Sequence, residues 1–293
     1  MEETPPKSQR NWSGKGKGSA LGNRIFMGLI SRFGIWPAYA LLVLVCTIYT
    51  FRDTTSIEAI RKFRTRLGLP TKRRHLFRHF FSMGTSLVDR FAFLLRGKLP
   101  FPCISHGQEI LAKALTHQKG VILISAHVGN WELAGNLLGT INETPINFIM
   151  MDAEREDIKE VYSPALQNRK VNVIHAGSDG LTVAIALRQA LGRNEIVCLH
   201  GDRVVDDAWE KIDFLNHPAS FPHGPFALAG RLGIPLIPVF VIRTGALRYE
   251  VRAEEPLLDG TKADRTGHLA GDAMKRYVRL LEEKVQCHPY EWH

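Results

Sequence analysis

The sequence predicts an α/β fold: a largely parallel central sheet flanked by helices, preceded by an N-terminal helical region. After Pro100, short apolar runs alternate with stretches of helical spacing. This βαβα alternation is typical of parallel strands joined by helical crossovers, with helices on both faces of the sheet. Before Pro100, one long uncharged run and one amphipathic pattern predict helices.

The charge distribution separates the same two regions. The chain has 293 residues and a net charge of +9; residues 1–100 contain 18 Lys and Arg against 5 Asp and Glu, whereas the other 193 contain 20 against 24. A basic excess confined to one region favours an anionic surface or partner for that region. The four cysteines lie far apart without a CxxC pair, which fits a reducing compartment and argues against a disulfide framework or a zinc knuckle.

The N-terminal elements divide into a flexible basic tail at 1–20 and a helical membrane-associating region at 21–98. Residues 33–51 are 19 residues without a charge, which reaches the lower range for a bilayer span. Basic residues flank this run on both sides, so we favour a helix that lies in or dips into the inner leaflet with both ends on the cytoplasmic side. A buried first helix of the globular domain is the alternative. The run starts late and lacks a small-residue cleavage site, which argues against a signal peptide.

The next helix is expected over Thr71–Leu95. Apolar residues recur there at helical spacing: Leu76, Phe80, Met83, Leu87, Phe91 and Leu94. A basic face at residues 72–78 fits phospholipid headgroups or plain solvent equally well.

The α/β domain is predicted over 99–293. Strands are expected at 120–126, 146–151, 171–175, 195–200 and 234–242, and helices at 131–141, 155–168, 179–191 and about 264–285. In open α/β sheets, ligands bind at the carboxyl ends of the strands.

One such end carries a histidine, because the run "VILISAHVGNWELAG" ends on His127 and continues through a polar turn into a helical pattern. Asn130 is the expected N-cap, which places Glu132 in the first turn. A turn between His127 and Glu132 lets the carboxylate reach the imidazole, fix its tautomer and raise its basicity. The alternative is a structural histidine beside a carboxylate favoured by the helix dipole, and for an isolated H-x4-E pair this alternative is the commoner case.

A second chemical segment, "HGDRVVDD" at 200–207, places Asp202 and Arg203 at another strand end. Four residues there present a possible metal cluster: His200, Asp202, Asp206 and Asp207. Their crowding in one loop without a paired-histidine spacing favours a solvated acidic loop, so we predict no metal site. No G-x-S-x-G elbow is present, which suggests that the attacking nucleophile belongs to the substrate.

With these residues assembled, the chain resembles a known group. "HVGNWE" is similar to the H-x4-D/E signature of the lysophospholipid acyltransferase superfamily, in the form found in lipid A biosynthesis (lauroyl/myristoyl) acyltransferases. The similarity continues in order through "GDR", "FLNHPASFPHGPFALA" and "IPLIPV", and covers about residues 20–293. It looks closest to the acyltransferases of this superfamily that are sometimes fused to glycosyltransferases. The ending "HPYEWH" resembles the P-x-x-W-x-H close of the lipid A group.

The resemblance implies transfer of a fatty acyl group from a thioester, on acyl carrier protein or coenzyme A, to a hydroxyl or amine of a lipid or glycolipid acceptor. It implies His127 as general base and Glu132 as its orienting partner. It also implies a substrate-binding set: Asn130, Arg169, Asp202, Arg203, Phe221, Pro222, His223 and Gly224. His223 stands where the superfamily often has Glu, and Arg203 where lipid A enzymes usually have Gln, which bears on the identity of the acceptor.

The implied setting is the cytoplasmic face of the inner membrane, with an anionic membrane surface as partner and no cofactor besides the acyl-thioester co-substrate. A catalytically inactive, membrane-bound lipid-binding or scaffolding protein of the same fold is the alternative. Nucleic-acid binding is not favoured, because the basic third lacks an interleaved aromatic pattern or a helix-turn-helix.

Overall fold

The computed structural model describes residues 20–97, 101–131, 133, 144–150, 171–175, 180–204, 208–245 and 247–292. The predicted tail before residue 20 lies outside these residues. The predicted helices at 131–141 and 155–168 also lie outside them, apart from Trp131 and Leu133.

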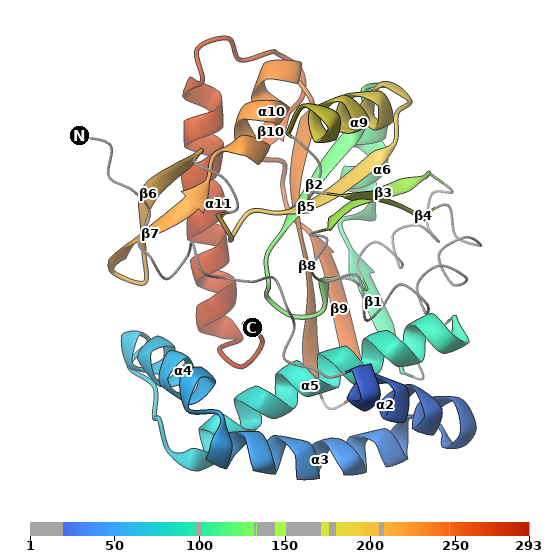
Figure 1. The fold of residues 1–293 in the computed structure, drawn as a ribbon. Helices are drawn as coiled ribbons and strands as arrows, with labels where there is room; N and C mark the ends of the chain where they lie inside the picture. The colour runs from blue at the N-terminus through green and yellow to red at the C-terminus, as the bar shows by residue number, and fades with distance from the viewer. Residues whose placement is uncertain are drawn as a thin grey trace.

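The centre of the molecule is a mixed, mostly parallel sheet (Figure 1). Its strands are β1 (Cys103–His106), β2 (Val121–Ser125), β3 (Ile146–Met150), β4 (Val171–His175), β5 (Ile196–His200), β8 (Pro235–Gly245), β9 (Arg248–Ala253) and β10 (Leu258–Asp259), in the order β1-β9-β8-β2-β5-β3-β4 with β10 beside β8. Strands β8, β2, β5, β3 and β4 are parallel, which confirms the predicted class of sheet. Strand β9 is antiparallel to β8, and β1 pairs with β9.

Helices cover both faces of the sheet. Inner residues of β2 alternate between two apolar clusters: Leu123 belongs to the cluster shared with α6 (Gln108–Leu115) and the N-terminal helices, and Ile124 to the cluster shared with α9 (Gly180–Gly192), α10 (Gly224–Leu232) and α11 (His268–Cys287). All five residues of β2 are buried, as expected for a strand covered on both sides.

Five of the described strands were absent from the sequence prediction: β1, β9, β10 and the two strands of a separate hairpin. The hairpin of β6 (Trp209–Phe214) and β7 (His217–Pro222) turns at Leu215 and Asn216, both with positive φ. Two consecutive residues with positive φ are typical of tight hairpin turns, and Asn, Asp or Gly usually occupies both positions. Because Leu215 occupies the first, the sequence lacks the usual hairpin-turn pattern. The β8–β9 pair was missed because β9 alternates exposed and buried residues over only six positions.

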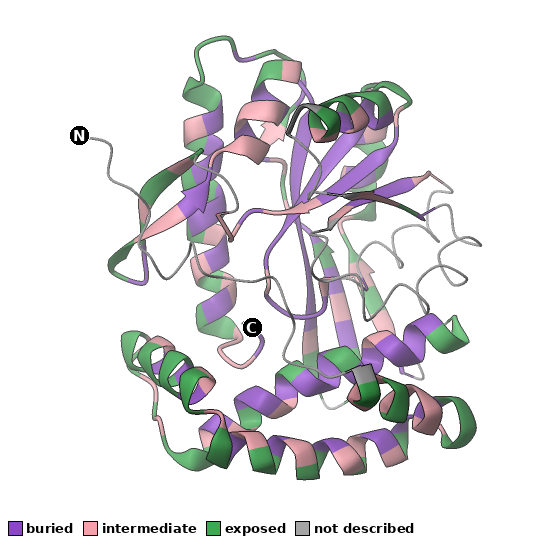
Figure 2. Cartoon of the chain, in the orientation of Figure 1, coloured by how far each residue is buried: buried purple, intermediate pink, exposed green. Residues whose placement is uncertain are grey.

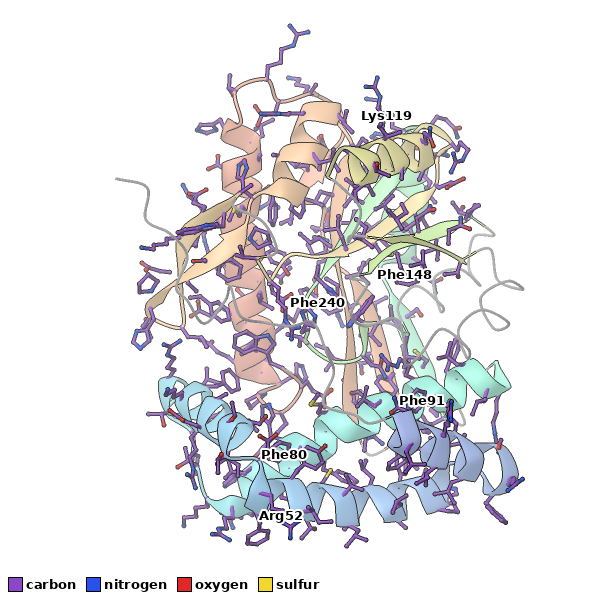
Figure 3. The ribbon with its side chains drawn as sticks, in the orientation of Figure 1. Arg52, Phe80, Phe91, Lys119, Phe148 and Phe240 are labelled. Atoms are coloured by element: carbon purple, nitrogen blue, oxygen red, sulfur yellow. The ribbon has the colours of Figure 1, made fainter. Side chains whose placement is uncertain are left out.

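The N-terminal region forms a helical layer at the lower edge of the sheet, drawn in blue and cyan in Figure 1. It consists of α2 (Ala20–Phe33), α3 (Ile35–Arg52), α4 (Thr54–Arg66) and α5 (Arg73–Arg96). Helices α3 and α5 run along each other, and their side chains fill the space between them, as at Phe80 (Figure 3), whose ring lies 6.0 Å from that of Tyr49. The helices predicted at 33–51 and 71–95 are therefore present as α3 and α5.

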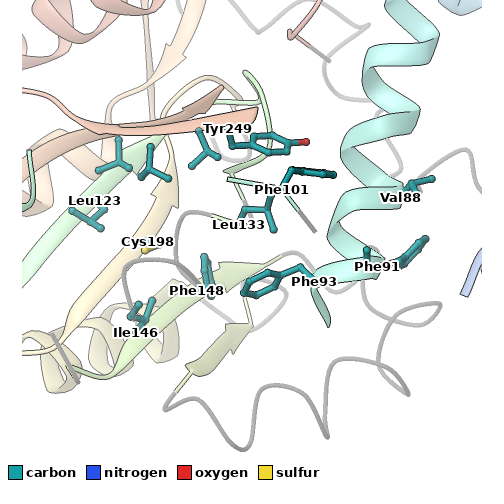
Figure 4. Close-up of a cluster of buried hydrophobic side chains, with 14 of the residues drawn as sticks. Val88, Phe91, Phe93, Phe101, Leu123, Leu133, Ile146, Phe148, Cys198 and Tyr249 are labelled. Carbon is teal, nitrogen blue, oxygen red and sulfur yellow. The ribbon is translucent and has the colours of Figure 1, made fainter. Parts of the chain in front are cut away.

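The buried arc of α5 differs from the predicted one. Met83 and Leu87, assigned to its apolar face, are 39% and 38% exposed, whereas Ser82 and Ser86 are buried. Helix α5 is contacted by α3 on one side and by the sheet and its loops on another, so the covered arc is wider than a single apolar stripe and includes polar positions. Figure 4 shows the apolar part of this contact, where Phe91 and Phe93 belong to the same buried cluster as Phe148 and Tyr249.

Candidate active site

The register of β2 and β5 brings the two predicted chemical segments together. Ser125 pairs with His200 in the parallel ladder, and the chain continues past each of them in the same direction. His127 and Asp202 therefore stand two residues beyond paired positions on adjacent strands. The carboxyl ends of these strands point toward α5 (Figure 1), because Asn130, in the turn after β2, hydrogen-bonds the Ser86 carbonyl of that helix.

Asp202 holds His127 by two hydrogen bonds. Its Oδ1 lies 2.9 Å from His127 Nδ1, and its Oδ2 accepts the His127 backbone N–H at 2.8 Å. The Asp202 side chain is 3% exposed and that of His127 is 15% exposed. Burial alone would raise the pKa of the Asp202 carboxyl, but the His127 ring and its hydrogen bonds hold that pKa well below the usual value. Asp202 is therefore a carboxylate, and Nε2 of His127 is left for another partner.

One ring packs on the imidazole of His127, and a second ring packs on the first. The His200 ring lies 4.1 Å from that of His127, and the Trp131 ring lies 4.1 Å from His200 on another side. Burial, and then the charge of His127, lower the pKa of His200 well below its usual value, so this ring is neutral. Its Nε2 is buried and has no hydrogen-bond partner among the described residues. A neutral, apolar wall of this kind favours the uncharged form of any group placed against it.

The turn after His127 depends on a glycine. Gly129 has φ +71°, and a Cβ there would lie 1.9 Å from the Val241 carbonyl oxygen. The turn lies this close to β8 because the Asn130 N–H donates to the Val241 carbonyl at 2.8 Å. The Gly129 N–H donates to the Glu291 carbonyl at 2.6 Å. The turn is thus fixed by β8 and by the C-terminal segment 288–292.

An apolar cavity lies beside the site. It is lined by Leu123, Ser125, Trp131, Phe148, Cys198, Leu199 and Val239. Its volume of about 10 Å³ is near the space that one water molecule needs. A longer ligand would therefore require neighbouring side chains to move.

The other predicted substrate-binding residues within the described ranges lie in the turn after β2, after the end of β5 and at the junction of β7 and α10. Phe221 is a buried core residue whose ring packs on Phe214, and His223 precedes α10, which starts at Gly224. The His223 N–H donates to the Ala208 carbonyl, and Pro222 is buried at the end of β7. Asn130 is 5% exposed, with its amide on the Ser86 carbonyl. Arg203 follows Asp202 directly, and its charge helps to lower the pKa of His200.

Two predicted residues, Glu132 and Arg169, lie outside the described residues, as do Asp206 and Asp207. Within the described ranges no group of three His, Cys, Asp or Glu side chains is placed to hold a metal ion.

The sequence did not pair Asp202 with His127. Strands β2 and β5 are neighbours in space, but two other strands separate them along the chain, so their adjacency is a property of the topology. The signal that was present is a repeated pattern: each segment is a buried strand followed, two residues past its end, by a titratable side chain.

A carboxylate on Nδ1 keeps the proton on that nitrogen and leaves Nε2 as a proton acceptor. This arrangement suits removal of a proton from a bound hydroxyl or amine.

Comparisons with known proteins show the family of the chain. The family model described as "Bacterial lipid A biosynthesis acyltransferase" matches residues 89–293, well over half of the chain. The phosphatidylinositol mannoside acyltransferase of Mycobacterium tuberculosis is 26% identical over 191 residues, which cover 64% of this chain and 57% of that protein. That of Mycolicibacterium smegmatis is 26% identical over 205 residues, covering 66% and 64% respectively. The matched part thus spans less than two thirds of each relative. By the match of the family model, the chain belongs to the bacterial lipid A biosynthesis acyltransferase family.

Proposed function

We propose that this protein transfers a fatty acyl group from an acyl thioester, on acyl carrier protein or coenzyme A, to a hydroxyl or amine of a lipid or glycolipid acceptor, with His127 as general base. The observation that carries the proposal is the His127–Asp202 pair at the carboxyl end of β2, in a chain of an acyltransferase family. The acceptor chemistry is that named for the relatives, whose acceptors are phosphatidylinositol mannosides.

The step balances with the groups present. Nε2 of His127 takes the proton from the acceptor hydroxyl or amine as its oxygen or nitrogen attacks the thioester carbonyl. The carbon–sulfur bond breaks, and the leaving thiolate takes the proton back from the imidazolium. Asp202 stabilises the imidazolium formed in between and fixes the ring. Glu132, the orienting partner predicted from the sequence, remains a second candidate for that role, and the backbone N–H groups after Asn130 or Arg169 remain the candidates for binding the oxyanion.

The apolar cavity beside Trp131 and Phe148 is the proposed place for the start of the acyl chain. Residues of β2, β3, β5 and β8 line it together with Trp131, and apart from the Ser125 hydroxyl and the Cys198 thiol their side chains are apolar. Arg203, His223 and the residues around them stay the candidates for the polar part of the acceptor.

The test is acyl transfer by purified protein, supplied with labelled acyl carrier protein or acyl-coenzyme A and a bacterial lipid extract, with products identified by mass spectrometry. We expect His127→Ala and Asp202→Asn to lower kcat by about 10²–10⁴-fold with the fold intact. Glu132→Gln separates the two orienting candidates: if Asp202 is the partner, Glu132→Gln retains more activity than Asp202→Asn.

The matched control is Asp213→Asn, which neutralises an exposed carboxylate on β6. Full activity of His127→Ala would refute the proposed mechanism. Absence of turnover by the wild-type protein with both thioesters would instead support the inactive lipid-binding alternative.

The membrane part of the proposal depends on how α3 is packed. Among the described residues, α3 alone is long and apolar enough to cross a bilayer. One face of it is buried on α5, at Ile35, Ala38, Leu42, Cys46 and Thr50, while large apolar side chains of the other face are exposed, at Trp36, Val43, Leu44, Ile48 and Phe51. Figure 2 shows exposed positions alternating with buried ones along α3.

We infer that α3 lies in the plane of the membrane surface rather than crossing it. A crossing helix would have to leave α5, breaking the contact of Leu42 with Gly84 and the hydrogen bond of Tyr39 to Asp89. Exposed basic residues continue the same layer at Arg61, Lys62, Arg66, Lys72, Arg73, Arg74 and Arg78, which suits anionic headgroups. The family relationship supports membrane association, and the in-plane arrangement with both ends on the cytoplasmic side is our proposal.

Two leucines on the same helix test it. Leu44→Ser, at a side chain that is 59% exposed, should weaken binding to phosphatidylglycerol-containing vesicles by roughly tenfold while leaving the unfolding temperature unchanged. Leu42→Ser, at a side chain that is 4% exposed, should instead destabilise the fold. Cysteines placed at Arg32 and Arg52 should both be labelled from the cytoplasmic side; labelling of one from the opposite side would show that α3 spans the membrane.

A further inference from the structure

Helix α5 buries five polar side chains, Thr85 and four others that we call the polar stripe: His79, Ser82, Ser86 and Asp89. Their spacing of three, four and three residues places them on one face of the helix. Asp89 has no exposed surface, and the other three are at most 9% exposed. Burying such groups is costly unless each finds a partner. The side chains of His79, Ser82 and Asp89 have partners, whereas the Ser86 hydroxyl has none among the described residues, and Ser86 contributes through its backbone carbonyl.

The first two stripe residues hold the C-terminal segment. His79 Nε2 lies 2.8 Å from the Trp292 carbonyl oxygen, and the Ser82 hydroxyl donates to Glu291 Oε1 at 2.6 Å. This segment in turn holds the turn after His127, because the Glu291 carbonyl accepts the Gly129 N–H and Trp292 forms a β-bridge with Val128.

The last two positions reach the same turn more directly. The Ser86 carbonyl accepts from Asn130 Nδ2 at 2.8 Å. Asp89 Oδ2 accepts from the Tyr249 hydroxyl at 2.6 Å, and the Asn130 side chain also hydrogen-bonds that hydroxyl. Figure 4 shows the Tyr249 hydroxyl pointing from the sheet toward α5.

Asp89 also links the stripe to α3. Its Oδ1 accepts from the Tyr39 hydroxyl, and Arg243 of β8 donates to the same hydroxyl at 3.3 Å. The carboxylate thus joins three elements: α3 in the outer layer, α5, and β9 through Tyr249.

From these contacts we propose that the polar stripe is a positioning element for the general base, with Asp89, Tyr249 and Ser82 as positioning residues that fix the turn carrying His127. The inference rests on the proposed acyl transfer for its effect on rate, but the geometry it describes exists without substrate. Two routes of hydrogen bonds connect the turn to α5, one through Asn130 and one through Glu291. Loosening either route lets His127 move, and a displacement of about 1 Å in a catalytic group can cost roughly 10²-fold in rate.

The test uses Tyr249→Phe and Ser82→Ala, each of which removes one hydroxyl from one route. Tyr249→Phe keeps the ring that stacks on Phe101, with centroids 5.9 Å apart. The control is Thr85→Val, because Thr85 is a neighbouring buried hydroxyl whose hydrogen bond goes to the Ser82 carbonyl of its own helix.

Two readouts separate positioning from general stability. Hydrogen–deuterium exchange at the Gly129 and Asn130 amides should speed up by about tenfold in both variants, and kcat should fall by about tenfold while KM stays within about threefold. Thr85→Val should change neither. If Tyr249→Phe does not fold, Ser82→Ala tests the other route on its own.

Exchange rates equal to those of Thr85→Val would overturn the inference, as would a rise in KM with kcat unchanged. Because exchange is measured without substrate, it tests the positioning role even if no acyl transfer is found. Faster exchange together with an absent wild-type activity would count against the proposed function and not against the stripe.

Discussion

The two longest described helices hold the active-site region from different sides and by different means. Helix α11 buries an apolar face, at Ala270, Ala273, Met274, Tyr277, Val278, Leu281 and Val285, whereas α5 adds the four residues of the polar stripe to its apolar contacts. Apolar packing is non-directional, but hydrogen bonds prescribe both distance and angle. Helix α11 therefore mainly supplies stability, whereas α5 also fixes geometry.

Gly129 offers the most severe way to break this arrangement, because both strand β8 and the segment held by α5 meet there. Gly129→Ala places a Cβ against the Val241 carbonyl oxygen at a positive φ. The neighbour is backbone and cannot rotate away, so we expect a loss of at least about 4 kcal/mol in the free energy of unfolding, or no folded protein. Denaturant unfolding measures it.

The control for this change is Gly28→Ala, at a helical position of α2 where a Cβ would meet no atom within 4 Å. That change should be neutral or slightly stabilising. A Gly129→Ala protein as stable as wild type would mean that the turn does not have the close approach described.

The polar stripe should also make the free energy of unfolding depend on pH. Burial raises the pKa of Asp89 to about 6, against opposing hydrogen bonds from Tyr249 and Tyr39 and the charge of Arg243. A carboxyl whose pKa is raised in the folded state stabilises the fold fully below its unfolded pKa and loses that contribution as pH rises through about 6. As pH rises from about 4 to 6, the free energy of unfolding of Asp89→Asn should therefore increase relative to that of wild type, by up to about 3 kcal/mol.

The contribution of His79 to unfolding free energy depends on pH with the opposite sign from that of Asp89. Comparing Asp89→Asn with wild type is therefore more informative than the wild-type unfolding curve alone. Burial lowers the pKa of His79 to about 4, which removes stability as pH falls below its unfolded value. The two slopes partly cancel in the wild-type protein. Unfolding curves of wild type and Asp89→Asn at matched pH values isolate the Asp89 part, and a pH-independent difference would show that its pKa is not raised.

The sequence was most informative where one element carries its own signal. The buried run of β2, the histidine after it and the long uncharged run of α3 were each predicted from neighbouring residues. The polar stripe could not be predicted, because Ser82 and Ser86 look like solvent-facing residues between Met83 and Leu87. The Ser82 hydroxyl bonds Glu291 and the Ser86 carbonyl bonds Asn130, and only the folded topology brings these two partners to α5. Asp202 was recognised as a site residue, yet its contact with His127 required the order of strands.

The smallest expected effect comes from the one hydroxyl of α11 that reaches the active-site region. The Tyr277 hydroxyl donates to the Ser125 carbonyl at 2.7 Å, just before His127, but the Gly201 N–H donates to the same oxygen at 2.9 Å. Because that carbonyl keeps a donor in Tyr277→Phe, we expect a loss of about 1 kcal/mol in unfolding free energy and little change in kcat. Tyr249→Phe makes the same chemical change on the α5 side, where the hydroxyl connects Asp89 to Asn130, and should differ from Tyr277→Phe by a clear loss of kcat. Unfolding and kinetic measurements on Tyr277→Phe and Tyr249→Phe test whether α11 supports the fold while α5 positions the active-site turn. Equal losses of kcat in the two variants would remove that distinction.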